Sequence, residues 1–384
     1  MKTTTPTLKS IVLFALLWIA SANLIGQMGG NPVVSPEISD GNEVTFRLYA
    51  PKASEVTMYG EWTSSYMDRT ALVKNDTGLW SITVGPLSPE VYGYAFQVDG
   101  VTVLDPSNPL IRRDGQRNAS LILVPGEESE FFNVREVPHG TLSKVWYHSA
   151  SLSKDRRMYV YTPPAYNNGN KDYPVLYLLH GGGGDEDAWT TLGRTPYILD
   201  NLIAAGKAKP MLVVMTNGNA WQTAGPGDTP NASDSPVFSR ADYEKYRGQF
   251  EESLVKDVIP FIEKNYRVKA SKDMRAIAGL SMGGGHTITA TINYPEVFGY
   301  IGVFSSGIFQ PYDDLDGKML ALKESGVNKY WVACGEDDFV MEYNKKLLEA
   351  LDKSGMEYEY YENSGGHSWK NWRIYLYMFS PMLF

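Results

Sequence analysis

The sequence predicts an α/β protein. Its larger part is expected to be a mostly parallel, doubly covered sheet, preceded by a small all-β immunoglobulin-like sandwich. Near residue 138 the hydrophobic pattern changes from short alternating segments to continuous apolar segments separated by helical ones. One continuous segment runs directly into a glycine-flanked serine, "GLSMG" at 279–283, which a helical stretch follows. The chain of 384 residues is long enough for two domains.

Residues 28–137 are expected to form the all-β domain. Their predicted strands are short, alternate apolar with polar residues, and are rich in Val, Thr, Tyr and Phe. Gly, Pro and Asn-Asp turns separate them. Short strands at this spacing favour a sandwich of immunoglobulin type. The strands are expected at 42–51, 55–62, 78–85, 91–100 and 119–126.

Residues 138–384 are expected to form the α/β domain. Helical stretches, such as 250–266 and 339–354, separate its apolar strands. Continuous apolar strands joined by helices indicate a parallel sheet covered on both faces. In such sheets the functional groups lie at the C-terminal ends of the strands. The strands are expected at 173–181, 211–218, 274–280, 300–307 and 329–335.

Residues 1–22 have the features of a secretory signal peptide. Lys2 and Lys9 make its start positive, 11–20 is a short apolar core, and Ala20-Ser21-Ala22 is a typical cleavage site. An uncleaved anchor is the alternative interpretation, although the apolar core is short for a bilayer. No later segment is long and apolar enough to cross a membrane. The protein is therefore expected to be secreted, in a bacterial periplasm or outside the cell.

The composition excludes several classes of function. The net charge is −9, and it becomes more negative without residues 1–22, so a nucleic-acid partner is not expected. Cys334 is the only cysteine, so no disulfide framework is expected. With five histidines and no cysteine cluster, a zinc site is not expected either. The sequence does not indicate an oligomeric state.

Ser281 lies where the α/β-hydrolase fold places its nucleophile. A predicted strand precedes it and a predicted helix follows it, which is the setting of a nucleophile elbow. Gly279 and Gly283 are expected to avoid collisions in this tight turn. Gly284 and Gly285 are expected to let the helix begin close to the sheet. A flexible turn around an ordinary serine is the alternative interpretation.

A serine nucleophile needs a base, and His367 is the predicted one. His367 lies in the glycine-rich loop "ENSGGHSWKNW" near the C-terminus, which follows the predicted strand 357–361. The hydrolase fold places its base in this part of the chain. His286, five residues after Ser281, is expected to be a packed or exposed helix residue.

The acid of the triad is expected between the serine and the histidine, at the end of a strand. The segment "WVACGEDDFV" at 331–340 contains Glu336, Asp337 and Asp338. Asp338 is favoured as the group that orients and stabilises the imidazole. Asp337 remains the alternative for the triad acid, because hydrophobic periodicity does not distinguish adjacent residues in a turn.

The loop "HGGGG" at 180–184 is expected to help bind an oxyanion. Glycines let backbone N–H groups face a tetrahedral intermediate without obstruction by side chains. The predicted donors are the N–H groups of Gly182 and of Met282, directly after the nucleophile. A phosphate-binding loop is the alternative, but the segment lacks the GK[ST] ending of a P-loop.

Taken together, these motifs resemble carbohydrate esterase family one. The chain is similar to the feruloyl esterase domains attached to bacterial xylanases, over about 138–384. The all-β part resembles the early-set, carbohydrate-module-like domain that often precedes such esterases. The matching segments are 156–166, 173–184, 259–268, 278–284, 333–338 and 365–373.

The resemblance implies a serine carboxylic ester hydrolase acting on feruloylated or acetylated xylan, without metal or organic cofactor. Release of ferulate from arabinoxylan is the favoured reaction. Acetyl xylan esterase and siderophore (enterochelin-type) esterase activities are the alternatives, because relatives on the same scaffold carry them out. A non-enzymatic binding protein and an acyl transferase are the other classes considered.

The long Pro/Gly-rich segment 216–249 leaves the end of a strand and is expected to overhang Ser281. Within it, Trp221, Gln222 and Tyr243 are predicted to bind the acyl group, and Trp369 is predicted to flank them. Packing of these aromatic residues within the loop is the alternative.

The all-β domain is expected to support the esterase without binding glycan by itself. The alternative is glycan binding through Trp62, Tyr66 or Trp80.

Overall fold

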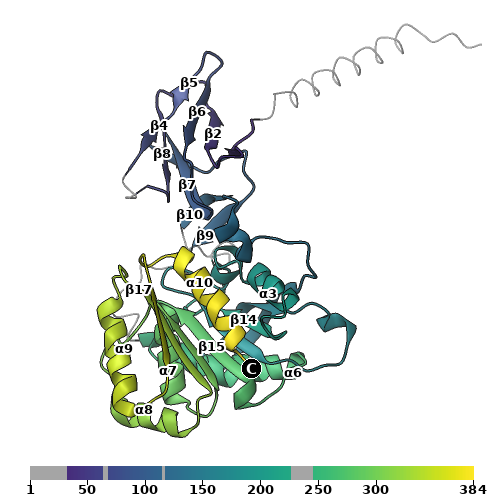
Figure 1. Ribbon diagram of the computed structural model, residues 1–384, viewed down its shortest axis with the longest axis vertical. Helices are drawn as coiled ribbons and strands as arrows, with labels where there is room; N and C mark the ends of the chain where they lie inside the picture. The colour runs from purple at the N-terminus through teal and green to yellow at the C-terminus, as the bar shows by residue number, and fades with distance from the viewer. Residues whose placement is uncertain (1–32, 64–67, 115–116, 226–244) are drawn as a thin grey trace, which may run out of the picture. The chain divides into compact units, whose positions relative to one another are not determined.

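The computed structural model describes residues 33–63, 68–114, 117–225 and 245–384 (Figure 1). The predicted signal peptide, Tyr66 and Tyr243 therefore lie outside the described residues.

The chain divides into two compact units. Residues 110–137, which the sequence analysis assigns to the all-β domain, are grouped with the second unit. The first unit consists of residues up to 59, 63–87 and 95–109, and the second of residues 60–62, 88–94 and 110–384.

Two antiparallel sheets form the predicted β-sandwich. One has the strand order β1-β2-β6-β5, and the other has the order β4-β3-β7-β10-β9, with β8 paired to β7. The first sheet contains β1 (Glu37–Ile38), β2 (Val44–Tyr49), β5 (Val73–Lys74) and β6 (Leu79–Val84). The second contains β3 (Val56–Gly60), β4 (Thr70–Ala71), β7 (Val91–Val98), β8 (Val101–Val103), β9 (Ile111–Asp114) and β10 (Arg117–Leu123).

Alternation along the strands builds the core of the sandwich. Val44, Phe46 and Leu48 of β2 are buried, while the residues between them are partly exposed. Trp80 of β6 is also buried, and its indole Nε1–H donates a hydrogen bond of 2.9 Å to the carbonyl oxygen of Ala50. Trp80 therefore packs the core and is not available as a glycan contact.

The second unit is built on an eight-stranded sheet with the order β11-β12-β14-β13-β15-β16-β17-β18. The pairs β11–β12 and β12–β14 are antiparallel, and the remaining pairs are parallel. The strands are β11 (Thr141–Ser149), β12 (Lys154–Thr162), β13 (Val175–Leu179), β14 (Leu212–Thr216), β15 (Arg275–Leu280), β16 (Tyr300–Phe304), β17 (Lys329–Gly335) and β18 (Glu359–Asn363).

Helices cover both faces of this sheet, as expected for strands that are apolar throughout (Figure 1). On one face of the sheet lie α3 (Thr195–Ala204), α10 (Trp369–Phe379) and the short α2 (Ala188–Thr191). On the other face lie α5 (Gln249–Ser253), α6 (Ile259–Asn265), α7 (Met282–Asn293), α8 (Leu315–Glu324) and α9 (Met341–Ser354). Strands such as β13 and β14 are buried along their whole length, which explains their lack of alternation.

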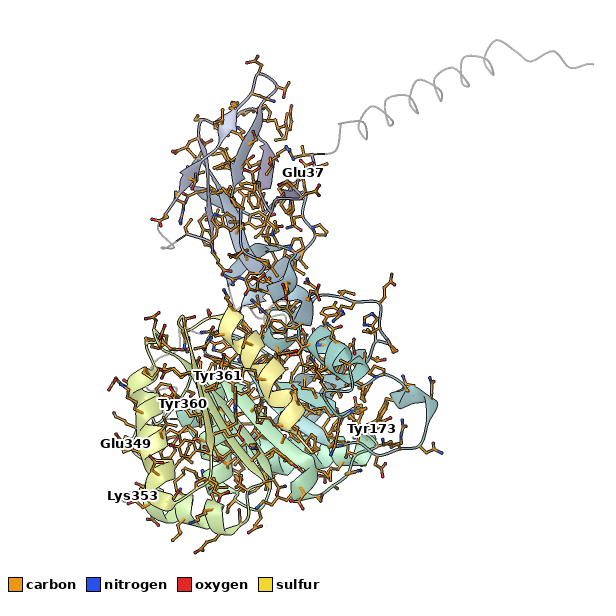
Figure 2. The ribbon with its side chains drawn as sticks, viewed as in Figure 1. Glu37, Tyr173, Glu349, Lys353, Tyr360 and Tyr361 are labelled. Carbon is orange, nitrogen blue, oxygen red and sulfur yellow. The ribbon has the colours of Figure 1, made fainter. Side chains whose placement is uncertain are left out.

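Helix α9 shows how the covering helices are divided between core and solvent. Leu347 and Leu351 are buried in the core. Glu349 and Lys353 are exposed on the outer side of the helix (Figure 2). This one-sided distribution is the pattern of an amphipathic surface helix.

The segment predicted as one helix at 250–266 is helical in three consecutive pieces. A π-helical turn, Leu254–Val258, separates α5 from α6. Phe250, Leu254, Val258 and Ile262 of this segment are buried, whereas Phe261 is only partly buried. In the described part of the chain, no helix has the length and apolar character needed to cross a bilayer.

Candidate active site

Ser281 forms a sharp turn between β15, which ends at Leu280, and α7, which begins at Met282. Its backbone has φ 53° and ψ −116°. A positive φ is uncommon outside glycine and costs on the order of 1–3 kcal/mol, so surrounding contacts must hold it. The N–H of Ser281 donates to the carbonyl oxygen of Phe304 at 3.0 Å, and the Ser306 hydroxyl donates to the carbonyl oxygen of Ser281 at 2.7 Å.

Glycines beside Ser281 let the turn pack against the neighbouring strand. A Cβ at Gly283 would lie 2.5 Å from the carbonyl oxygens of Leu179 and His180. A Cβ at Gly279 would collide with the backbone carbonyl of Gly283. Both positions therefore require glycine, as the sequence predicts.

The two following glycines differ from each other. A Cβ at Gly284 would collide with the side chain of Ser306, which supports the expected close packing at this position. A Cβ at Gly285 would meet only Phe309, at an ordinary 3.9 Å. The expectation that both glycines serve close packing therefore holds for Gly284 and is wrong for Gly285.

The structure brings Ser281, His367 and Asp338 together in one hydrogen-bonded chain. His367 Nε2 lies 2.9 Å from the Ser281 hydroxyl oxygen, and His367 Nδ1 lies 2.9 Å from Asp338 Oδ1. An ionised Asp338 can only accept, so Nδ1 carries the proton. Nε2 is then left to accept from the serine hydroxyl.

Burial distinguishes Asp338 from its neighbours. Asp338 is 4% exposed, and its Oδ1 also accepts a hydrogen bond of 3.1 Å from the N–H of Val340. Burial alone would raise the pKa of Asp338, but the hydrogen bonds from His367 and Val340 outweigh burial and lower the pKa below its usual value. Glu336 and Asp337 are exposed.

Of the two predicted oxyanion donors, Met282 directly follows Ser281, and Gly182 belongs to a loop that passes close to the serine. Met282 is the first residue of α7, so the helix does not use its N–H. Gly181 precedes Gly182 in the glycine loop, and a Cβ at Gly181 would lie 3.2 Å from Ser281 Cβ. This loop therefore runs past the serine. A Cβ at Gly182 would meet no atom within 4 Å, so the loop faces open space there.

His180 connects the glycine loop after β13 with the loop after β14, a role that sequence analysis missed. Its Nδ1 lies 2.8 Å from the carbonyl oxygen of Gly181, and its Nε2 lies 2.8 Å from the backbone nitrogen of Gly218. A carbonyl only accepts and an N–H only donates, so the ring is neutral with its proton on Nδ1. Burial lowers the pKa of His180 to about 4. No pattern in the sequence separates His180 from an ordinary strand-end histidine.

A buried ion pair under the same loops also went unrecognised in the sequence. Arg157 Nε donates to Glu186 Oε1 at 2.6 Å, and both residues are 1% exposed. Glu186 also accepts from the side chain of Asn217 at 3.0 Å and from the N–H of Gly225 at 2.9 Å. Such a fully bonded carboxylate holds the loop segments in one arrangement.

Two of the four predicted substrate-binding residues lie elsewhere. Gln222 is buried, and its side-chain oxygen accepts from Asn217 at 2.9 Å and from Asn219 at 3.0 Å, so it supports its own loop. Trp369 packs edge-on against Trp189 and Trp372, with ring centroids 5.3 and 5.1 Å away. Neither residue lines the pocket beside the serine.

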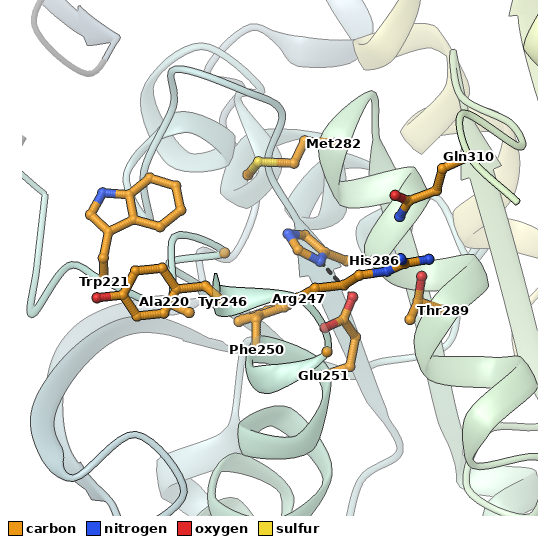
Figure 3. Close-up of a pocket in the computed structure, with 12 residues that line it drawn as sticks. Ala220, Trp221, Tyr246, Arg247, Phe250, Glu251, Met282, His286, Thr289 and Gln310 are labelled. Carbon is orange, nitrogen blue, oxygen red and sulfur yellow. Dashed lines mark hydrogen bonds and ion pairs between the residues drawn. The ribbon is translucent and has the colours of Figure 1, made fainter. Parts of the chain in front are cut away.

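That pocket encloses about 480 Å³, its open mouth included (Figure 3). The predicted Trp221 does line it, together with Tyr246, whose ring centroid is 6.0 Å away. Phe250, Met282 and His286 line it as well. In Figure 3, Trp221 and Tyr246 lie on one side of the pocket, and Thr289 and Gln310 lie on the other.

One aromatic side chain near His367 was not foreseen. Phe339, directly after Asp338, is 73% exposed, and its ring centroid lies 4.4 Å from that of His367. Among the described residues, no group of three or more His, Cys, Asp or Glu side chains could hold a metal ion.

Comparison with known proteins agrees with this geometry. Residues 149–381 match the protein family described as "Putative esterase". The chain belongs to this esterase family. Residues 28–108 match carbohydrate-binding module 48, the isoamylase N-terminal domain. The predicted resemblance to carbohydrate esterase family one, with a β-sandwich before the esterase domain, is confirmed.

Two curated relatives show how much of a longer protein this esterase matches. It is 33% identical to an endo-1,4-beta-xylanase/feruloyl esterase of Xylanibacter ruminicola, over 91% of this chain and 46% of the relative. A second relative, an uncharacterised protein of Corynebacterium glutamicum, is 25% identical over 58% of this chain and 55% of its own. The esterase therefore spans about half the length of these curated relatives.

Solved structures share the fold. A CE1 ferulic acid esterase from Anaeromyces mucronatus, in complex with ferulic acid, is 26% identical with a TM-score of 0.57, covering 66% of this chain and 94% of its own. The enterobactin esterase of Shigella flexneri has a TM-score of 0.63 over 88% of this chain and 92% of its own, at 17% identity. The latter likeness shows the fold alone.

We predict that the two helix glycines respond differently to alanine. Gly283→Ala should force the elbow away from β13, lowering the melting temperature and reducing p-nitrophenyl acetate hydrolysis by about 100-fold, because small displacements of reacting groups are costly. Gly285→Ala, which meets only an ordinary contact, should keep both properties close to wild type. Equal effects of the two substitutions in thermal melts and initial rates would contradict this account of the turn.

We also predict that His180 makes stability depend on pH between about 6.5 and 4. The unfolded chain binds a proton near pH 6.5 but the folded protein only near pH 4, so the contribution of His180 is complete above pH 6.5 and is lost as the pH falls to 4. The loss should be about 3 kcal/mol across this window. Urea unfolding at pH 7 and at pH 4.5 measures the free energy of unfolding at each pH. The change in this free energy between the two pH values should be smaller for His180→Gln than for wild type. Equal changes in the two proteins would contradict the role of His180 in the pH dependence.

Proposed function

We propose that this protein is a secreted serine carboxylic ester hydrolase that releases ferulate from arabinoxylan through an acyl-enzyme. The observation that carries the hydrolytic part is the chain of hydrogen bonds from Ser281 through His367 to Asp338, set on a turn with positive φ. Such a nucleophile, base and orienting acid form the arrangement that serine hydrolases share.

The proposed reaction has two steps. His367 Nε2 takes the proton of Ser281 as its oxygen attacks the ester carbonyl, and then gives that proton to the departing sugar hydroxyl. Water next attacks the acyl-enzyme, with His367 again taking and returning a proton, and ferulate leaves. Asp338 keeps the proton on Nδ1 and stabilises the imidazolium in both steps.

The oxyanion formed in each step is proposed to bind the N–H groups of Met282 and Gly182. The N-terminus of α7 favours negative charge at this point. Donors held in place before the reaction stabilise the developing charge without reorganisation.

The acyl group is proposed to lie in the pocket that begins at Met282. Trp221, Tyr246 and Phe250 give this pocket an aromatic lining suited to a flat ring. Tyr243 stays a proposed contribution to the same lining. Ferulate is favoured over acetate because the relative from Xylanibacter ruminicola is named a feruloyl esterase, and because an acetyl group has no ring to pack against the aromatic lining.

The arabinoxylan substrate and secretion rest on the sequence and the relatives. Residues 1–22 have the pattern of a secretory signal, and two relatives are named endo-1,4-beta-xylanases. In this proposal the β-sandwich supports the esterase domain without needing to bind glycan by itself.

A product assay tests the substrate. The purified protein is offered feruloylated arabinoxylan, acetylated xylan and a catecholate siderophore ester side by side, and the released acids are separated by chromatography. Ferulate should be the main product. Acetate or a dihydroxybenzoyl product in its place would support one of the two alternatives, and a transferred acyl group on an added sugar would indicate a transferase.

Asparagine substitutions at neighbouring acids test the triad. Asp338→Asn should lower kcat by about 10⁴-fold, because an amide no longer holds His367 in the tautomer that accepts the serine proton. Asp337→Asn, at an exposed side chain one residue away, should stay close to wild type. Rates on p-nitrophenyl acetate and melting temperatures of both variants make the comparison, and an equal loss in both would exclude Asp338 as the orienting acid.

A further inference from the structure

A second histidine–carboxylate pair lies in the acyl pocket and takes no part in the proposed triad. His286 of α7 and Glu251 of α5 both line this pocket, and His286 Nδ1 lies 2.8 Å from Glu251 Oε1 (Figure 3). Phe250, the neighbour of Glu251, packs on the His286 ring with centroids 4.6 Å apart. The His286 ring is therefore held by Glu251 and by Phe250.

Each member of the pair has one polar side-chain atom without a hydrogen-bond partner among the described residues. Glu251 is 4% exposed, and its Oε2 is buried without a hydrogen-bond partner among the described residues. The same holds for Nε2 of His286. Buried polar atoms without partners are costly, so they are rarely retained unless something binds them.

Both of these atoms, Glu251 Oε2 and His286 Nε2, are suited to accept a hydrogen bond. An ionised Glu251 can only accept, so His286 Nδ1 carries the proton of the pair, and Nε2 has a free electron pair. A hydroxyl group from a ligand could donate to either atom. An ether oxygen or a methyl group could not.

His286 lies farther along α7 than the nucleophile, and it lines the same pocket as Met282. His286 is five residues after Ser281, which is a rise of about 7.5 Å along a helix. Met282, the first residue after the nucleophile, lines the same pocket. An extended acyl group with its carbonyl at Ser281 and its ring between Trp221 and Phe250 would bring its far end toward His286.

We propose that Glu251 and His286 recognise the phenolic hydroxyl of the acyl group and so make the enzyme selective for hydroxycinnamoyl esters. This inference rests on the proposed feruloyl esterase function and adds the determinant of acyl selectivity. The phenol donates its hydrogen to Glu251 Oε2 or His286 Nε2, and an acyl group without the hydroxyl leaves both buried atoms unpaired. Sites that require a hydroxyl in this way discriminate strongly against analogues that lack it.

Two esters that differ only at this hydroxyl test the inference in the wild-type protein. Methyl ferulate carries the phenol, and methyl 3,4-dimethoxycinnamate carries a methoxy group in its place. The ratio of kcat/KM for the two esters should favour methyl ferulate by at least about tenfold. The Ser281→Ala variant should likewise bind ferulate at least about tenfold more tightly than 3,4-dimethoxycinnamate in calorimetry.

Glutamine substitutions then assign the selectivity to the pair. His286→Gln and Glu251→Gln should each bring the ratio of the two esters close to one. His148→Gln is the matched control, because His148 makes the same 2.8 Å contact with Asp155 in an exposed pair outside the pocket. This control should keep the wild-type ratio, and melting temperatures identify any variant that fails to fold.

The outcomes separate this inference from the proposed function. If wild type cleaves neither ester, the feruloyl esterase proposal fails and the inference fails with it. If wild type cleaves both esters equally well, or if folded pair variants keep the wild-type ratio, recognition of the phenol by Glu251 and His286 is wrong. In that case the feruloyl esterase proposal still stands.

Discussion

Between the last residue of β15 and the first residue of α7 there is only Ser281, and the rest of the site depends on how that residue turns. Its positive φ is held by hydrogen bonds to Phe304 and Ser306, and by the close approach of Gly283 to β13. This packing directs the serine hydroxyl toward His367 and places the first N–H of α7 beside it. A bulkier residue at Gly283 would move all of these groups together.

Buried polar groups extend this constraint from the turn to the loops around it. His180 joins the loops that follow β13 and β14, and Glu186 binds Arg157 and Asn217 beneath them. These groups are desolvated and bonded, so the loops have few alternative positions. The wall of the pocket that carries Trp221 is therefore built on a rigid base. The Glu251–His286 pair differs because its bonds are incomplete, and this is why it points to a ligand.

The candidate triad was predictable because its members follow strands in a known order. Ser281 has a glycine on each side, and His367 follows a late strand in a glycine-rich loop. The residues that line the pocket were harder to predict, since an aromatic or amide side chain in a long loop can face either a pocket or its own loop. Trp221 faces the pocket, whereas Gln222, one residue later, is used within the loop.

The sequence by itself determined the two-part architecture, the covered parallel sheet and the serine turn, because hydrophobic period and glycine spacing are local properties of the chain. The tertiary structure decided which of two adjacent aspartates meets His367, since only burial and the Val340 N–H distinguish Asp338 from Asp337. It also decided that His286 pairs with Glu251, from a helix far away in sequence. Contacts between distant segments depend on how the sheet brings its loops together, and no local pattern records them.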